Sequence, residues 1–231
     1  MIKTISLLLF LQIIISNTMG NNLNDVLDDS LQTYIKAAEK DFAQIPQERK
    51  IELEKIAVFI QAKVKAGKSA QLTYICTHNS RRSHFGQIWA ATAAAYYGIP
   101  NVKTFSGGTE STAFNERAVA ACRRVGFDIN QITKEKNATY EVKYAAGAEP
   151  IKAFSKKFSD LSNPQSDFCA IMTCSQADEA CPVVKGAILR VAIPYEDPKA
   201  FDGKPEETAK YDERCKQIAT ETLYVFSKVK I

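Results

Sequence analysis

Two residues that could do chemistry together, Cys76 and Arg82, stand in the segment Ile-Cys-Thr-His-Asn-Ser-Arg-Arg-Ser at residues 75–83. The apolar run 72–75 is typical of a strand, and the alanine-rich run 85–97 is typical of a helix. A loop that leads into a helix N-terminus presents consecutive backbone N–H groups, which bind tetrahedral oxyanions. The spacing therefore predicts an oxyanion site with a cysteine at one end and an arginine at the other.

Both side chains would add to such a site. Arg82 can hold two oxyanion oxygens because its guanidinium is planar and bidentate. The same positive field favours the thiolate form of Cys76, and the thiolate is the nucleophile. The alternative is an ordinary strand-to-helix turn with a buried cysteine. The serine that follows Arg82 and the flanking strand and helix make this alternative the poorer explanation.

The segment resembles the phosphate-binding loop of the low-molecular-weight protein tyrosine phosphatase superfamily, which includes the thioredoxin-coupled arsenate reductases. The resemblance covers about residues 70–231 and implies a substrate-binding loop made of Thr77, His78, Asn79, Ser80, Arg81 and Ser83. It also implies that Asn79 and Ser83 shape the loop, with Ser83 donating to the thiolate. Family members usually have glycine at the position of His78, which suits a positive φ, and many have a second cysteine at the position of Arg81.

Two further cysteines, Cys174 and Cys181, follow the apolar run 168–171. They resemble the redox pair of the arsenate reductases, which the tyrosine phosphatases do not share; the alternative is two unrelated cysteines flanking a surface helix. If residues 175–180 are helical, the two cysteines lie on one face but about 10 Å apart. A disulfide needs Cα atoms about 4.4–6.8 Å apart. A Cys174–Cys181 disulfide therefore requires this segment to unwind, which suits a redox switch better than a static crosslink.

An Asp-Pro step at Asp197 and Pro198 follows the apolar run 189–193 and resembles the general-acid loop of the family. Pro198 disfavours helical backbone at Asp197, so the carboxylate should lie on a loop beside the strand end. There it could protonate a leaving oxygen, with Glu196 as the alternative acid. Phosphatase members often have an aromatic residue after the Asp-Pro step. Lys199 stands there in this chain, which argues against a phosphotyrosine cleft.

Strands and helices alternate from residue 71 onward, which predicts an α/β fold with a four-stranded parallel sheet and helices on both faces. This is the flavodoxin-like architecture that the resemblance also implies. The expected strands are 71–76, 102–106, 168–174 and 189–193, and the expected helices are 83–97, 113–125, 175–180 and 205–228. Ligands bind at the carboxyl ends of parallel strands, so Cys76, Cys174 and Asp197 should converge at one edge of the sheet.

The pattern divides the chain into a signal peptide at 1–20, a helical extension at 21–68 and a phosphatase-like catalytic domain at 69–231. The apolar stripes of the two helices in the extension are expected to pack on the catalytic domain. Within that domain, residues 139–158 should form an inserted β-hairpin that turns at 145–150. Such a hairpin could cover the cleft.

The first residues combine one lysine, an apolar core and small or polar residues up to Gly20, which is typical of a secretory signal peptide. The apolar core is short for a membrane span, which needs about 20 apolar residues. We therefore expect export to the periplasm or cell envelope, with no stable membrane span after cleavage. The alternatives are an uncleaved N-terminal anchor and, if the signal assignment is wrong, a cytoplasmic protein.

The net charge is +4 and the lysines are scattered, which does not indicate a nucleic-acid partner. An exported chain with six cysteines could form disulfides, whereas a reductase cycle needs its cysteines reduced at the start. Either a thiol donor works in that compartment, or the signal assignment is wrong, or the cysteine pair is structural. The remaining cysteines, Cys122, Cys169 and Cys215, are expected to be buried packing residues.

Together the motifs predict a thiol-dependent arsenate reductase. The resemblance implies that Cys76 attacks arsenate, Asp197 protonates the departing oxygen, Cys174 attacks Cys76 to release arsenite, and Cys181 then frees Cys76. No bound cofactor or metal is expected, and an external dithiol such as thioredoxin would reduce the Cys174–Cys181 pair. One alternative is a phosphatase that uses Cys76, Arg82 and Asp197 with water in place of Cys174. The other is a non-catalytic oxyanion-binding protein.

Overall fold

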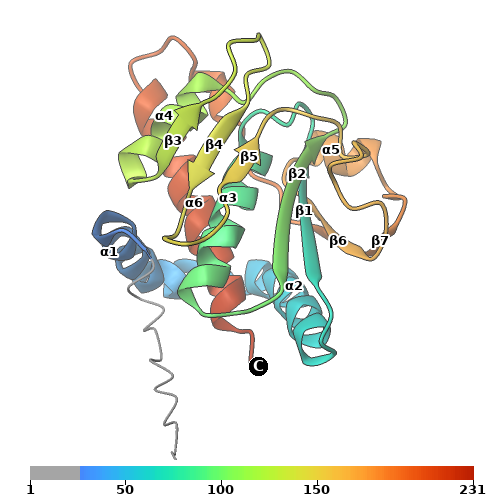
Figure 1. Cartoon of the computed structure of the whole chain (residues 1–231). Coiled ribbons are helices and arrows are strands. Elements are labelled where there is room, and N and C mark those ends of the chain that lie inside the picture. Colours follow the sequence, from blue (N-terminus) through green and yellow to red (C-terminus); the bar gives the residue numbers. More distant parts are fainter. Residues whose placement is uncertain (1–26) are drawn as a thin grey trace, which may run out of the picture.

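The computed structural model of the chain describes residues 27–231, so the expected signal peptide lies outside the described residues. A four-stranded sheet in the order β2-β1-β6-β7 forms its centre (Figure 1). The strands are β1 (Ala70–Cys76), β2 (Val102–Gly108), β6 (Phe168–Met172) and β7 (Ala187–Ala192). All three pairings between them are parallel, as the alternation of strands and helices predicts.

Helices cover both faces of this sheet. They are α1 (Asp29–Glu39), α2 (Gln47–Lys65), α3 (Arg82–Tyr96), α4 (Glu116–Val125), α5 (Ser175–Ala180) and α6 (Glu207–Ser227). Side chains alternate along β1: Leu72 and Tyr74 join the large core formed with α2, α3 and α6, whereas Ile75 faces the opposite way. The opposite face is covered by α5 and by connecting segments, including Phe158 and Val184. The predicted fold class is therefore confirmed.

The two N-terminal helices pack on the rest of the chain, as their apolar stripes predict. Both contact α6, and α2 also contacts β7. The Tyr34 ring of α1 stacks on Trp89 of α3 with 5.5 Å between ring centroids. Arg49 of α2 forms an ion pair with Glu221 of α6 at 2.8 Å. Among residues 27–231, no helix is both long and apolar enough to cross a membrane.

A second sheet is formed by β3 (Asp128–Gln131), β4 (Tyr140–Lys143) and β5 (Ile151–Ala153), all paired antiparallel. Strands β4 and β5 are the predicted hairpin. Strand β3 is not predicted, because its sequence Asp-Ile-Asn-Gln offers one apolar side chain and no alternation. Figure 1 shows this small sheet beside α4.

Two elements depart from their predicted limits. The strand expected at 168–174 ends at Met172, although the next residue, Thr173, still donates its N–H and its hydroxyl to Ile75 O of β1, at 2.7 and 2.9 Å. The helix expected at 113–125 begins at Glu116, because the Asn115 side chain caps it by accepting from backbone N–H groups of the first turn.

Helix α3 approaches β1 closely at Gly86, where a Cβ atom would lie 2.2 Å from Tyr74 Cδ1. We expect Gly86→Ala to lower the free energy of unfolding by about 1–3 kcal/mol, because the added methyl group overpacks this contact. Urea unfolding followed by the fluorescence of Trp89, the single tryptophan of the chain, measures the change. An exposed helical glycine would instead gain about 1 kcal/mol from the same replacement, and that result would contradict the close packing.

Candidate active site

The loop between β1 and α3 is held from outside through its carbonyl groups. The pairs are Thr109 N with Cys76 O at 3.1 Å, Glu110 N with Thr77 O at 2.8 Å, Asn115 N with Ser80 O at 2.9 Å, and Ser155 Oγ with His78 O at 2.9 Å. No backbone N–H of residues 77–82 donates to another group in the described part of the chain. Buried backbone donors are nearly always paired in native proteins. A run of unpaired backbone donors is therefore suited to bind an anion.

A chain of hydrogen bonds runs beneath this loop and ends at the cysteine. Lys156 N donates to Asn79 Oδ1, and Asn79 Nδ2 donates to Ser83 Oγ, each at 2.9 Å. Ser83 Oγ lies 3.1 Å from Cys76 Sγ. Because the serine oxygen already accepts from Asn79, its own proton is free to point at the sulfur. Ser83 can thus donate to Cys76, and such a bond is strongest when the sulfur carries negative charge.

The loop takes its positive φ at Asn79, where φ is 44°, and not at His78, where the family's usual glycine suggests it. Asparagine adopts this region more readily than most residues. A glycine at position 79 would allow the same backbone but would lose both side-chain hydrogen bonds. His78 is half-exposed, with Nε2 3.6 Å from Glu110 Oε2.

Arg82 and Asp197 meet from distant parts of the chain. Arg82 Nη2 donates to Asp197 Oδ2 at 2.7 Å, and Nη1 donates to Tyr195 O at 2.9 Å. Arg82 Nε is buried and finds no acceptor within residues 27–231. Asp197 Oδ1 accepts from Lys199 N at 3.1 Å, which caps the short 3-10 turn that begins at Pro198. The expected general acid therefore lies beside the loop.

Three cysteines share one small apolar cluster on the sheet face that α5 covers. Cys76 and Cys174 are buried in it, and Cys181 packs against it. Thr77 Oγ1 lies 3.4 Å from Cys174 Sγ and so connects the loop to the second cysteine. All three are free thiols. The structure therefore gathers the cysteines that the two sequence motifs single out.

Comparison with known proteins identifies the family of the chain. No protein-family profile matches the chain. An arsenate reductase of Brevibacillus brevis is 30% identical over 126 residues, which cover 54% of this chain and 74% of the relative. An arsenate reductase of Bacillus subtilis is 26% identical over 155 residues, covering 67% and 93%. The chain belongs to the arsenate reductase branch of the low-molecular-weight phosphatase superfamily.

Among solved structures, the low-molecular-weight protein tyrosine phosphatase of T. tengcongensis superposes with a TM-score of 0.48 at 14% identity. The superposition covers 69% of this reductase-family chain and 99% of that chain.

Helix α5 is intact between Cys174 and Cys181. Cys174 Sγ accepts from Ala177 N at 3.4 Å at the start of the helix, and Cys181 ends it. Arg190 of β7 holds the far end: it donates to Asp178 O at 2.8 Å and to Cys181 O at 3.1 Å, and it pairs with the Asp178 carboxylate. The sequence gives no sign of this contact, because Arg190 lies in a strand nine residues beyond Cys181.

The remaining cysteines lie in the large core, as expected. Cys122, Cys169 and Cys215 are fully buried. Burial raises the pKa of the Cys169 thiol and of the Cys122 thiol far above the usual value, which keeps both groups protonated.

A buried histidine behind the loop is not identified from the sequence. The His84 ring stacks on Phe114 with 4.1 Å between centroids, and Nδ1 lies 3.4 Å from Ser106 Oγ. Burial, together with the nearby charge of Lys156, lowers the pKa of His84 to about 3. The ring is therefore neutral near pH 7 and serves as a packing group. A single histidine within a helical run gives no signal of this role in the sequence.

Two pockets border the loop. One of about 340 Å³ lies between Arg82, the Asp197 loop and the first turn of α5, and the exposed Glu196 also lines it. Another of about 870 Å³ is lined by His78 and Arg81 together with Tyr140 of β4. The inserted hairpin thus reaches the mouth of the loop. The Arg81 side chain is itself buried, with Nε donating to Tyr211 Oη at 3.1 Å.

The loop geometry is tested by replacing Asn79, with Asn101 as a matched control. Asn101 also has a positive φ, 58°, but lies at the start of β2. Asn101→Ala should cost about 1–2 kcal/mol of stability, because the backbone is left-handed there. Asn79→Ala should cost more, because it also removes two buried hydrogen bonds. Only Asn79→Ala should also weaken phosphate binding, by about tenfold or more, measured by isothermal titration calorimetry. Unchanged phosphate affinity in Asn79→Ala would show that the side chain does not organise the loop.

Proposed function

We propose that this protein is a thiol-dependent arsenate reductase that converts arsenate to arsenite through Cys76, Cys174 and Cys181. The observation that carries this proposal is the clustering of all three cysteines beside a loop whose backbone amides are unpaired in the described part of the chain. Ester hydrolysis needs only the first of them. The names of the curated relatives support arsenate as the substrate.

The first step is nucleophilic attack on the bound oxyanion. The loop amides hold arsenate, and Arg82 exchanges the Asp197 carboxylate for two arsenate oxygens. The Cys76 thiolate forms a bond to arsenic. Asp197, released from the arginine, takes up a proton and delivers it to the departing oxygen, which leaves as water. Arsenic remains in its +5 state in this adduct.

The second step is the reduction itself. The Cys174 thiolate attacks Cys76 Sγ, a disulfide forms, and the sulfur–arsenic bond breaks with its electron pair on arsenic. Two thiols are oxidised by two electrons and arsenate becomes arsenite. The contact between Thr77 Oγ1 and Cys174 Sγ supports this step, because it joins Cys174 to the loop.

The third step passes the disulfide outward. Cys181 attacks Cys174 Sγ and releases Cys76 as a thiolate, with no net change in oxidation state. Cysteines seven residues apart on an intact helix lie about 10 Å apart, so α5 has to unwind and Arg190 has to release its end. An external dithiol such as thioredoxin then reduces the Cys174–Cys181 disulfide and supplies two electrons.

A phosphatase is the second candidate, because one observation favours it independently of the cysteine pair. Arg82 and Asp197 are in direct contact beside Cys76, and this set suffices to form and hydrolyse a phosphocysteine. Lys199 after the Asp-Pro step, in place of an aromatic residue, disfavours an aryl ester as the natural substrate.

We also propose that the protein is exported, on the strength of the N-terminal signal pattern. Mass spectrometry of the protein from its native host should then show a chain that begins near Asn21. An intact Met1 in the soluble cytoplasmic fraction would contradict export and would place the reductase in a reducing compartment.

The cysteine relay is tested by two parallel assays of each variant: arsenite formation with thioredoxin, and hydrolysis of an aryl phosphate. Cys76→Ser should lose both activities. Cys174→Ser should release no arsenite, and Cys181→Ser should stop after one turnover with a Cys76–Cys174 disulfide that mass spectrometry detects. Both variants should keep any phosphatase activity, since that reaction does not use them.

The matched control for this experiment is Cys169→Ala, a buried cysteine of the large core that should sustain many turnovers. Repeated arsenate turnover in both Cys174→Ser and Cys181→Ser would make the pair structural. Ester hydrolysis without arsenite formation in the unaltered protein would favour the phosphatase. If the unaltered protein performs neither reaction but binds phosphate, it is a non-catalytic oxyanion-binding protein.

A further inference from the structure

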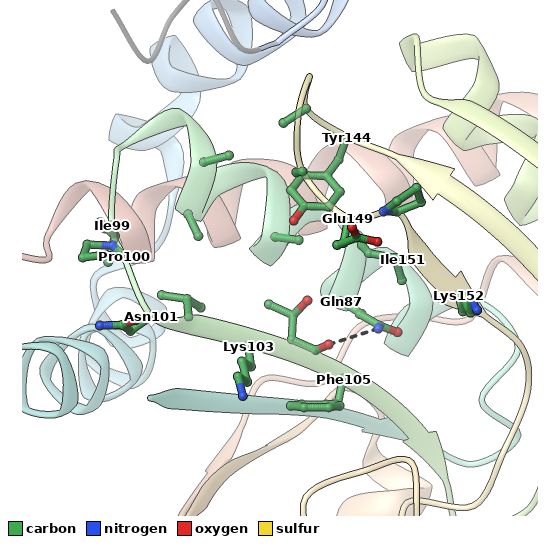
Figure 2. A pocket seen from close by; sticks show the side chains of 18 of the residues that line it. Gln87, Ile99, Pro100, Asn101, Lys103, Phe105, Tyr144, Glu149, Ile151 and Lys152 are labelled. Atoms are coloured by element: carbon green, nitrogen blue, oxygen red, sulfur yellow. Dashed lines mark hydrogen bonds between the residues drawn. The ribbon is translucent and has the colours of Figure 1, made fainter. Parts of the chain in front are cut away.

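A separate pocket of about 750 Å³ lies between α3, β2 and the hairpin formed by β4 and β5 (Figure 2). None of residues 76–83 lines it. Figure 2 shows Tyr144 and Ile151 on the hairpin side of the cavity, across from Gln87 of α3 and Phe105 of β2. Its other walls include Ala91, Ala94 and Ile99. The pocket is therefore mainly apolar and distinct from the oxyanion loop.

One cation is buried in this apolar setting. Lys156 lines the pocket, is 6% exposed, and places Nζ 4.4 Å from the centroid of the Phe154 ring. Its Nζ forms no ion pair or hydrogen bond with any residue of 27–231. Burial lowers the pKa of Lys156 to about 8, against the opposing charge of Asp160, so the ammonium form predominates at pH 7. The Nζ atom is not among the fully buried side-chain atoms of residues 27–231 that lack a hydrogen bond, so it stays accessible to a ligand although the side chain as a whole is buried. An anion in the pocket could pair with it.

Two buried amide oxygens follow along the same edge of β2. Gln87 Nε2 donates to Thr104 O, and Asn163 Nδ2 donates to Ser106 O, each at 3.1 Å. Their oxygens, Gln87 Oε1 and Asn163 Oδ1, accept no hydrogen bond in the described part of the chain. Two residues after Ser106 on β2, Gly108 N donates to Lys156 O at 2.9 Å, so the Lys156 backbone lies on the same edge of the strand. One cation and two acceptors therefore mark the polar end of the pocket.

The surrounding charge also favours an anion. Lys103 and Lys152 are exposed residues that line the pocket, and Glu149 is the single carboxylate among its described lining residues. The volume falls within the range of about 300–1,000 Å³ that is typical of small-molecule sites.

We propose that this pocket binds a small organic carboxylate with an apolar body and an N–H donor beside the carboxylate, the chemistry of an N-acyl amino acid. The carboxylate pairs with Lys156. The N–H donates to Gln87 Oε1 or Asn163 Oδ1 after a small rotation of the amide. The apolar body lies on the alanines of α3 and on the hairpin. Lys156 and one of the two unpaired amide oxygens then gain the partner that their chemistry requires.

The test is calorimetric titration of the purified protein with N-octanoylglycine and, in parallel, with the uncharged N-octanoylglycinamide. N-octanoylglycine should bind saturably at one site, and the amide should bind about tenfold more weakly or worse. Lys156→Met should weaken N-octanoylglycine binding by a similar factor, because methionine keeps the length of the side chain and removes the charge. Lys152→Met, at the exposed rim, is the matched control and should bind like the unaltered protein.

A second variant keeps the charge and fills the space. Ala95→Leu, on the half-buried side of α3 that lines the pocket, should block N-octanoylglycine while thermal unfolding shows a folded protein. If Lys156→Met does not fold, Ala95→Leu decides. No saturable binding at millimolar probe, equal binding of the amide, or unchanged binding by both pocket variants would overturn the proposal.

Discussion

The side chain of Asn79 is the constraint on which the rest of the site depends. Its backbone is left-handed at the turn of the loop, and its two hydrogen bonds fix that turn to Lys156 and Ser83. Ser83 Oγ in turn lies within hydrogen-bond distance of Cys76 Sγ. Anion binding and stabilisation of the thiolate therefore share one buried amide, so neither can be adjusted without the other.

The loop has little structure of its own and is held by segments that come later in the chain. Residues 109–115 after β2 and Ser155 after β5 occupy its carbonyl groups. The inserted sheet is thus connected to the chemistry, although it contributes no reacting group. Its last strand leads directly into Lys156, whose backbone supports Asn79 and whose side chain lines the separate pocket.

The cysteine cluster combines two opposing requirements. Cys76 and Cys174 are buried close to the loop, whereas the proposed transfer of a disulfide to Cys181 needs α5 to open. A helix of only six residues has few internal hydrogen bonds to lose. Arg190 stabilises the C-terminal end of this helix by donating hydrogen bonds to Cys181 O and Asp178 O. The stability of this short element, rather than the reactivity of any thiol, is where the exchange can be controlled.

Contiguous patterns in the sequence determined the strand-loop-helix unit around Cys76, the parallel sheet and the short helix between Cys174 and Cys181. These features depend on local spacing and on alternation, which the sequence displays directly. The strand β3 escapes prediction because Ile129 is its single apolar residue. Only the tertiary structure decided that Lys156 supports Asn79, that Arg82 meets Asp197 and that Arg190 holds α5. Each of these contacts joins residues from separate segments, and no local pattern marks which polar side chains will meet once the sheet brings those segments together.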